Sequence, residues 1–508
     1  MKQSLMAGIN SYLMVRKTRL WPALLVSAFF TAACEAPSAP PSTQVDNLVI
    51  IGIDTVGSDI FFSERINDAL STYLESAQQY RNANSVAPWT IPAVASTLTG
   101  LYPVQHNAGQ FQQQPANLDV DMPSPLEDSA VSLADMLNEH QFKTGAFSAH
   151  PWINANFGLA QGFKQLHARK GWQSVTTKFY EWLDETAKAP QPPRFFGYLH
   201  FMEAHDWHLK KRAERKERLA GVDPVLRKKL LEDASSAACV DENHNICQSN
   251  LVYNLAVREL RIAIADIMQQ LENRDLLKNT VVLVYSDHGE EFWEHKTEHQ
   301  QRTDPRGIYG FGHGQSLYQE LLHVPLVVWH PGIKGTTRQD LVSLIDVVPS
   351  ALNWLGIEPE GEPLPGRKMP AGTDPISETN DSRTIYASGI SYGPEAISAR
   401  EGQLKSIMHY PDESFEYFDL GKDPEEKHPT KSDDLTMRFD VLTGDYIDLK
   451  NESLASSREL DAQTLEHLKS IGYLQGVEEQ PTREAEKVPA KESVADDGSN
   501  NPDPEDQP

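Results

Sequence analysis

Apolar runs that end in polar residues recur along the chain and indicate buried strands. The run Asn47–Asp54 (NLVIIGID) ends in a carboxylate, and Thr280–His288 (TVVLVYSDH) repeats this design with an aspartate and a histidine at its end. Because neither run alternates between apolar and polar residues, both are typical of parallel strands covered on both faces. Residues 194–208 and 323–332 contain two further runs that predict strands.

Segments with helical periodicity lie between these runs. Apolar residues recur at three- and four-residue spacing in 254–277, and 344–359 is a second helical pattern that stops at a glycine. This alternation predicts an α/β fold in which a mostly parallel sheet is sandwiched by helices. The functional site of such a sheet lies beyond the carboxyl ends of its strands.

The pattern changes after about residue 375. Short alternating segments separated by turn residues predict a small antiparallel subdomain over 376–475, ending in a helix at 461–474. The last segment, 476–508, carries ten acidic residues, three basic residues and no aromatic residue. Such a segment cannot bury enough apolar surface to fold, so we expect a disordered acidic tail.

The chain of 508 residues is long enough for one large domain and a smaller one. Its formal net charge of −26 favours solubility and argues against nucleic acid as a partner. Against this acidic background, 209–230 is a basic segment with a helical pattern, within an insertion at about 206–250. It is either a solvated helix face or a patch that attracts an anionic substrate or phospholipid headgroups.

The N-terminus is similar to a bacterial secretory signal with a lipoprotein cleavage site. Basic residues precede a short apolar run at 20–30, and the small residues that follow end at Cys34. Thr31 stands where such signals usually have leucine, so a plain signal peptide or an uncleaved anchor stays open. We expect a signal peptide over 1–33, lipidation of Cys34 and a Pro/Ser-rich linker over 34–46. The protein is then anchored by lipid in the bacterial cell envelope, on the outer membrane facing the periplasm, or is exported.

Export also bears on the two remaining cysteines, Cys239 and Cys247. In an oxidising compartment they favour a local disulfide. A metal pair is less consistent with the sequence, because no second pair of cysteines accompanies them.

Three polar side chains follow the predicted strands: Asp54, Asp287 and His288. Two carboxylates and an imidazole at strand ends are a ligand set for a divalent cation. One ring nitrogen with several oxygens suits Zn²⁺, Mn²⁺, Mg²⁺ or Ca²⁺ and does not select one of them. We therefore expect one divalent metal ion.

Thr90 lies at the start of a helical pattern, WTIPAVASTLTG. Pro92 falls in the first turn, where its missing N–H costs nothing. Free N–H groups and the helix dipole favour an anion at such a helix end. A hydroxyl on a metal ion beside it can ionise and attack an electrophile. The alternative is that Thr90 only caps the helix.

Four segments, in this order and spacing, resemble the sulfatase family of the alkaline phosphatase superfamily. They are 47–54, 87–103, 286–292 and 312–332. The resemblance covers roughly 47–475 and implies an alkaline phosphatase-like fold, with a sulfatase-like catalytic domain over 47–375.

The resemblance also implies a role for each matching residue. It assigns as metal ligands Asp54, Thr90, Asp287 and His288. Thr90 matches the nucleophile, and His205 matches the histidine that acts on the leaving group or the bound anion. His313 falls where the family has a basic residue that contacts the anion.

Several positions depart from the family pattern. True sulfatases have a cysteine or serine that is converted to formylglycine, and a threonine cannot form that aldehyde. Val94 replaces the arginine of the maturation signature, and Thr55 replaces a second metal-site aspartate. One family lysine is missing from 145–159. Threonine nucleophiles occur elsewhere in the superfamily, in phosphodiesterases and in phospho-group transferases of the bacterial envelope.

These observations favour a metal-dependent hydrolase or transferase that acts on phosphate or sulfate esters through Thr90. The expected substrate is a phosphorylated or sulfated glycan, lipid or small ester. One alternative is a catalytically degenerate envelope protein that binds an anionic glycan or a partner. Another is a sulfuric ester hydrolase that uses an unmodified hydroxyl.

Two further groups of residues bear on the site. The grouped candidates for a second metal are Glu203, Asp206, His208 and His313. His295 and His299 lie either on a loop over the site or, as we expect, at the surface.

Overall fold

The central element of the protein is an eight-stranded sheet. The computed structural model describes residues 45–63, 68–110, 123–168, 171–205, 219–232, 245–295, 310–359, 361–372, 383–410, 412–430 and 432–449. The strand order is β11-β2-β10-β7-β1-β6-β4-β5. The strands are β1 (Asn47–Ile53), β2 (Gln78–Tyr80), β4 (Lys143–Ser148), β5 (Gln165–Ala168), β6 (Phe195–Phe201), β7 (Thr280–Ser286), β10 (Leu326–Trp329) and β11 (Thr336–Arg338).

Most neighbouring strands of this sheet are parallel. Strand β1 pairs in parallel with both β6 and β7, and β4 pairs in parallel with β5 and β6. Strand β10 is the exception, because it runs antiparallel to β7 and β2. The predicted mostly parallel sheet is therefore confirmed.

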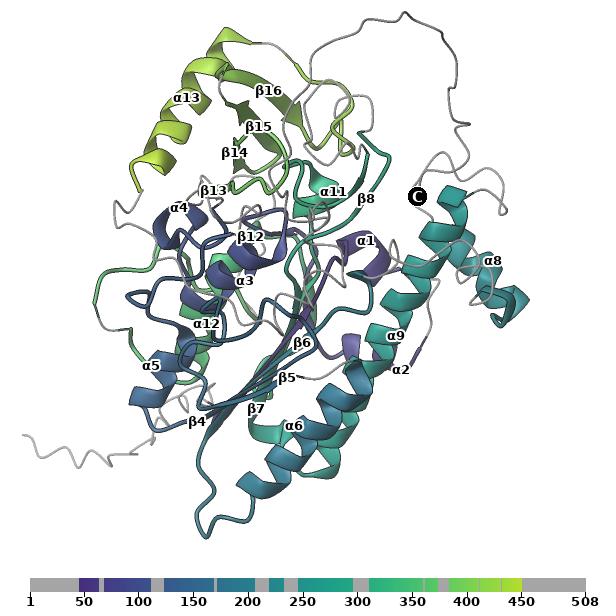
Figure 1. Ribbon diagram of the computed structural model, residues 1–508, viewed down its shortest axis with the longest axis vertical. Helices are drawn as coiled ribbons and strands as arrows, with labels where there is room; N and C mark the ends of the chain where they lie inside the picture. The colour runs from purple at the N-terminus through teal and green to yellow at the C-terminus, as the bar shows by residue number, and fades with distance from the viewer. Residues whose placement is uncertain are drawn as a thin grey trace, which may run out of the picture. The chain divides into compact units, whose positions relative to one another are not determined.

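Helices cover both faces of the sheet (Figure 1). One face packs against α3 (Thr90–Thr99), α5 (Leu133–Glu139) and α12 (Val347–Trp354). The other packs against α2 (Ala69–Leu74), α6 (Trp172–Thr186) and α9 (Asn245–Asn273). Successive residues of a strand point to opposite faces. In β1, accordingly, Leu48 and Ile50 belong to the first core and Val49 and Ile51 to the second.

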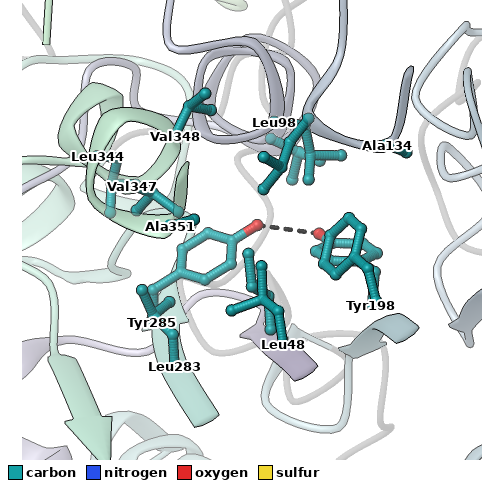
Figure 2. Packing of buried hydrophobic residues seen from close by; sticks show 14 of the residues in the cluster. Leu48, Leu98, Ala134, Tyr198, Leu283, Tyr285, Leu344, Val347, Val348 and Ala351 are labelled. Carbon is teal, nitrogen blue, oxygen red and sulfur yellow. Dashed lines mark hydrogen bonds between the residues drawn. The ribbon is translucent and has the colours of Figure 1, made fainter. Parts of the chain in front are cut away.

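Figure 2 shows part of the first core, where side chains of three adjacent strands meet the covering helices. This core contains Leu48 of β1, Tyr198 of β6 and Tyr285 of β7, and the hydroxyl groups of the two tyrosines are hydrogen-bonded. Leu98 of α3 and Val347 of α12 close this core from above. Two tyrosine hydroxyls in an apolar core need each other as partners, because an unpaired buried hydroxyl is costly.

The remaining elements are short. The helices are α1 (Ser58–Phe61), α4 (Pro103–His106), α8 (Pro224–Glu232), α11 (Gln319–Leu322) and the 3₁₀ turns η2 (Leu277–Asn279) and η3 (Leu344–Asp346). Two small ladders pair β3 (Ala83–Asn84) with β12 (Val342–Ser343) and β8 (Glu291–Phe292) with β9 (Phe311–Gly312). Helix α8 contains part of the basic segment predicted at 209–230.

A separate four-stranded antiparallel sheet follows the large one in sequence. It contains β13 (Thr384–Ala387), β14 (Ala396–Glu401), β15 (Leu404–His409) and β16 (Ser414–Asp419). The predicted antiparallel C-terminal unit is thus confirmed. Helix α13 (Asp433–Ile447) follows it and was not predicted. The helix expected at 461–474 and the tail at 476–508 lie outside the described residues.

A buried ion pair fastens the small sheet to the large domain. Nζ of Lys405 lies 2.7 Å from Oε1 of Glu426 and donates to the carbonyl of Leu317 at 2.6 Å. The other carboxylate oxygen of Glu426 accepts the backbone N–H of Gln319 at 2.5 Å. Because a buried charge requires a partner, these contacts hold the subdomain against the segment that follows His313.

Candidate metal centre and active site

Two carboxylates and one imidazole meet at the carboxyl ends of β1 and β7. The register pairs Ile53 with Ser286, so Asp54 and Asp287 leave the sheet side by side. With His288 they form a group whose ligand atoms all lie within 4.8 Å of one another. All three side chains are fully buried. In the part of the chain that the structure describes, no other group of histidine, cysteine and acidic residues has this geometry.

The hydrogen bonds of this group fit a metal ion. Nδ1 of His288 donates to the carbonyl of Gly289 at 2.9 Å, so Nε2 is the ring nitrogen that would bind a metal ion, which displaces its proton. Oδ1 of Asp287 accepts two backbone N–H groups, from Thr55 at 3.3 Å and from His288 at 3.0 Å. Its Oδ2, and both oxygens of Asp54, are buried without a hydrogen bond of good geometry. Buried oxygens and an imidazole lone pair are ligands that a divalent cation accepts.

The electrostatics of the group also call for a cation. Burial opposes ionisation of Asp54, but the imidazoles of His205 and His150 outweigh it and lower the pKa of Asp54 well below its ordinary value. Burial raises the pKa of Asp287, and the charge of Asp54 adds to this effect. Burial acts against a charge on His288 too, yet Asp287 and Asp54 raise its pKa to about 9. A divalent cation would relieve the repulsion between the two carboxylates.

Thr90 is the first residue of α3, and its hydroxyl points at the ligand group. The capping position belongs to Trp89, whose indole N–H donates to the carbonyl of Gly389 at 2.8 Å. Oγ1 of Thr90 lies 3.3 Å from Nε2 of His288. Thr90 is therefore not the capping residue that one interpretation of the sequence required. It places a hydroxyl beside the ligands at a helix N-terminus, where negative charge is favoured.

His205 and His313 complete the wall of the site. The ring of His313 lies 4.5 Å from that of His288 and 5.1 Å from that of His205, measured between centroids. Nδ1 of His313 lies 3.2 Å from Oε1 of Glu290, a fully buried carboxylate. This contact orients the ring. The structure thus brings all the sequence-predicted catalytic and metal-ligating residues together.

Sequence reasoning missed His150 and His200, two further buried imidazoles beside the carboxylates. Nε2 of His150, just beyond the end of β4, lies 3.1 Å from Oδ2 of Asp54. Nε2 of His200, in β6, lies 3.9 Å from Oδ2 of Asp287. Burial lowers the pKa of His200 to about 3, so this imidazole is neutral. The signal for His200 was its position inside the apolar run at 194–208, whereas no strand was predicted ahead of His150.

Thr55, which stands where the family has an aspartate, holds the backbone beside Asp54 through hydrogen bonds. Its φ of 61° is left-handed, which is a strained conformation for a β-branched residue. Its hydroxyl donates to the carbonyl of Asp54 at 2.8 Å, and its own carbonyl accepts the hydroxyl of Tyr253 at 2.8 Å. Val94, which replaces the family arginine, is buried in the apolar core beneath α3.

The candidates for a second metal do not gather in the described part of the chain. Oε1 of Glu203 accepts the backbone N–H of Trp172 at 2.5 Å. His313 pairs with Glu290, while Asp206 and His208 lie outside the described residues.

The expectation of a surface position for His295 was wrong. Its side chain is 1% exposed, stacks on Tyr318 with 3.7 Å between ring centroids, and places Nδ1 2.6 Å from Oε1 of Glu320. Burial opposes a charge on His295, but Glu320 outweighs it and raises the pKa of the imidazole to about 9. His299 lies outside the described residues.

Several residues on which the export predictions rest also lie outside the described residues. The signal peptide, Cys34, the linker and Cys239 are not among the described residues, whereas Cys247 is buried in α9. The disulfide and the lipidation stay predictions. Within the described ranges, no helix has the length and apolar character needed to cross a membrane.

Comparisons with known proteins agree with the geometry. A family model described as Sulfatase matches residues 46–357. Human arylsulfatase K is 25% identical over 233 residues, which cover 43% of this chain and 41% of the relative. The endo-4-O-sulfatase of Bacteroides thetaiotaomicron is 27% identical over 154 residues, 30% of this chain and 27% of the relative. The chain thus matches about two fifths or less of the length of these curated relatives.

Solved structures share the fold over most of the chain. A 2-O GAG sulfatase superposes with a TM-score of 0.61 at 17% identity, covering 83% of this chain and 96% of that one. A phosphonate monoester hydrolase of Agrobacterium radiobacter superposes with a TM-score of 0.56 at 15% identity, covering 80% and 95%. At identities this low, the two superpositions are evidence for the fold alone.

Proposed function

The chain belongs to the sulfatase family, and from this premise we propose that it is a metal-dependent hydrolase of phosphate or phosphonate esters with Thr90 as its nucleophile. One observation carries the proposal. The hydroxyl of Thr90 lies 3.3 Å from Nε2 of His288, within the group formed by Asp54, Asp287 and His288. A metal-dependent ester hydrolase needs this pairing of an oxygen nucleophile with a cation site.

The side chains divide the chemistry between them. A divalent cation held by Asp54, Asp287 and His288 would lower the pKa of the Thr90 hydroxyl and offset the negative charge of the ester. Thr90 loses its proton to solvent, and its Oγ1 bonds to phosphorus as the bond from phosphorus to the leaving oxygen breaks. The leaving oxygen takes a proton from Nε2 of His313 or from His205.

The second half of the reaction frees the nucleophile. Water attacks the phosphothreonine and its proton passes to the imidazole that gave one up. The bond from phosphorus to Oγ1 breaks, and Oγ1 takes a proton back from solvent, which restores the Thr90 hydroxyl. Glu290 supports this proton transfer, because its carboxylate stabilises a positive His313 and holds Nε2 toward the site. If the hydroxyl of another molecule replaces the water, the same residues carry out phosphoryl transfer.

A second candidate is the hydrolysis of sulfate esters on a glycan. It is favoured by the similarity to arylsulfatase K, to an endo-4-O-sulfatase and to a 2-O GAG sulfatase. The residue at position 90 weighs against it, because threonine cannot become the formylglycine that sulfatases use. Sulfate cleavage here would require an unmodified hydroxyl.

One set of assays separates these candidates. The full chain, loaded in turn with Mn²⁺, Zn²⁺, Mg²⁺ or Ca²⁺, is assayed with p-nitrophenyl phosphate, p-nitrophenyl phenylphosphonate and p-nitrophenyl sulfate beside Thr90→Ala. Release from a phosphorus ester that Thr90→Ala abolishes supports the first candidate, and release from the sulfate alone supports the second. Inactivity of a folded, metal-loaded protein on all three would favour a binding protein.

The predicted lipid anchor would place this activity at a membrane. We keep lipidation of Cys34 as a proposal that rests on the N-terminal sequence alone. Labelling with a palmitate analogue in a bacterial host tests it, with Cys34→Ser as the control that should lose the label.

A further inference from the structure

A row of hydrogen-bonded side chains runs from Tyr285 through Tyr198 to His200, and its last member faces the carboxylate of Asp287. The hydroxyl oxygens of Tyr285 and Tyr198 lie 2.9 Å apart, and that of Tyr198 lies 2.8 Å from Nδ1 of His200 (Figure 2 shows the first of these bonds). Nε2 of His200 then faces Oδ2 of Asp287 at 3.9 Å. The four side chains are fully buried.

The protons in this row can all point the same way. Tyr285 donates to Tyr198, Tyr198 donates to Nδ1 of His200, and the single proton of the neutral imidazole then sits on Nε2. That N–H faces the carboxylate of Asp287. The opposite arrangement would turn an imidazole lone pair toward a buried carboxylate, where a low dielectric makes the repulsion strong.

Oδ2 is the oxygen of Asp287 that depends on this N–H. Backbone N–H groups satisfy Oδ1, whereas two imidazoles lie within 4 Å of Oδ2. One is His288, which donates Nδ1–H to a carbonyl and whose Nε2 would bind the cation in the loaded centre, so there it has no proton to give to Oδ2. The other is His200, so among the described residues His200 is the side-chain donor that faces Oδ2.

Gly52 of β1 makes room for this row. In the sheet register it lies between His200 of β6 and Tyr285 of β7. A Cβ at position 52 would lie 2.4 Å from Nδ1 of His200 and 3.2 Å from the hydroxyl of Tyr198. A glycine inside a buried strand weakens the strand, so its presence where the two rings meet indicates that their close approach matters.

We propose that Tyr285, Tyr198 and His200 form a positioning relay that orients the carboxylate of Asp287 and thereby sets the affinity of the centre for its cation. The inference rests on the proposed metal centre, and it concerns residues that do not touch the substrate. Carboxylate ligands depend on hydrogen bonds from a second layer of residues, and loss of such a bond weakens metal binding by about 10- to 100-fold.

Metal affinity, measured on the full chain after chelation, tests the relay. Mn²⁺ binding is followed by the electron paramagnetic resonance of the unbound ion, and Zn²⁺ binding by competition with a chromophoric chelator. We expect Tyr198→Phe and His200→Phe to weaken binding about 10- to 100-fold. Tyr285→Phe should have a smaller effect, because Tyr198 still donates to His200. His200→Gln should restore part of the affinity, because its amide places an N–H near the position of Nε2.

Two controls separate the relay from general damage and from the metal centre itself. Tyr80→Phe removes another buried tyrosine hydroxyl of the same sheet, which donates to the carbonyl of Pro370 at 2.7 Å, and should bind metal like the native chain. Asp287→Ala removes a ligand and should abolish binding. Circular dichroism confirms the fold of each variant, and Tyr198→Phe decides the matter if His200→Phe does not fold.

The outcomes are distinct. Native affinity in folded Tyr198→Phe and His200→Gln, together with loss of binding in Asp287→Ala, would overturn the relay and leave the proposed function intact. If the native chain binds neither ion, or if Asp287→Ala binds as tightly as the native chain, the metal centre fails and the relay with it.

Discussion

The Thr90 hydroxyl and the His288 imidazole are in contact, with 3.3 Å between Oγ1 and Nε2, although 198 positions separate them in the chain. Thr90 begins α3, whereas His288 follows β7, so the contact forms only once the helix has packed on the sheet. A helix N-terminus and a strand end, each weakly informative alone, together place a hydroxyl beside the candidate metal ligands.

Replacement of Thr90 by alanine should remove activity and spare the fold. Thr90 does not occupy the capping position, so we expect the free energy of unfolding to change by no more than about 1 kcal/mol. We expect kcat/KM to fall by about 10³-fold or more, because the bond-forming oxygen is gone. Thr90→Ser keeps that oxygen and is the matched control. A folded Thr90→Ala protein with near-native turnover would rule out this nucleophile.

Replacement of Asp287 by asparagine should stabilise the metal-free protein and destroy its response to metal. Asn keeps an oxygen for the two backbone N–H groups that Oδ1 accepts, while it removes a charge that burial disfavours and that also repels Asp54. In the presence of a chelator, we expect a gain of about 1 to 2 kcal/mol in the free energy of unfolding. Thermal melts with and without Mn²⁺ check this: the cation should raise the melting temperature of the native chain only. A metal-free variant less stable than the native chain would contradict the repulsion.

The residue that protonates the leaving group can be identified by comparing how much its replacement lowers kcat/KM on esters with different leaving groups. p-Nitrophenolate leaves easily without a proton, whereas phenolate needs one. If His313 is the acid, His313→Ala should lose about tenfold more kcat/KM on phenyl phosphate than on p-nitrophenyl phosphate, and His205→Ala should not. Glu290→Gln should follow His313→Ala in direction with a smaller loss, because an amide oxygen still accepts the Nδ1 proton. Equal losses on both esters would mean that neither imidazole is the acid.

The ion pair between His295 and Glu320 should make stability depend on pH. The pKa of His295 is raised to about 9 in the folded protein, despite the opposing charge of Lys427, from about 6.5 in an unfolded chain. Its contribution is therefore complete below about pH 6.5 and is lost as the pH rises through about 9. Glu320 has a lowered pKa, so its own contribution is lost on the acid side instead.

His295→Phe measures that contribution, since a phenyl ring keeps the stacking on Tyr318. At pH 6 we expect a loss of about 3 kcal/mol in the free energy of unfolding, with a smaller loss at pH 9.5. Denaturant unfolding at both pH values gives the two numbers. The double variant with Glu320→Gln removes the unpaired charge and should recover part of the stability. A loss that does not change with pH would exclude a charged His295.

Much of the site could be predicted from sequence, because polar residues that follow apolar strands lie at the carboxyl edge of a parallel sheet. Asp54, Asp287 and His288 follow apolar runs, and parallel strands bring such positions to one edge. His150 follows β4 in the same way, but no strand was predicted at those residues, so its position at the sheet edge was not predicted. His200 is different in kind, because it lies inside an apolar run and only the sheet register shows that it faces a carboxylate.

Other features depended on contacts that no local pattern contains. The periodicity of 254–277 predicted a helix there, yet α9 begins at Asn245 and ends at Asn273. The buried position of His295 follows from Glu320 and Tyr318, which lie in another segment and are polar or half-polar residues. A charged residue in a sequence predicts a surface position. Burying it costs free energy unless a partner elsewhere in the fold offsets the charge.

The register of β1 against β7 also has a consequence for the order of events in folding. The backbone N–H of Thr55 bonds to the carboxylate of Asp287 across 232 positions of chain, so the ligands converge only after the central strands have paired. Contacts this distant in sequence form late, because the long stretch of chain between the two residues must close into a loop before the contacts can stabilise the structure. We therefore expect the proposed cation to bind after the sheet has formed and not to act as a template for folding.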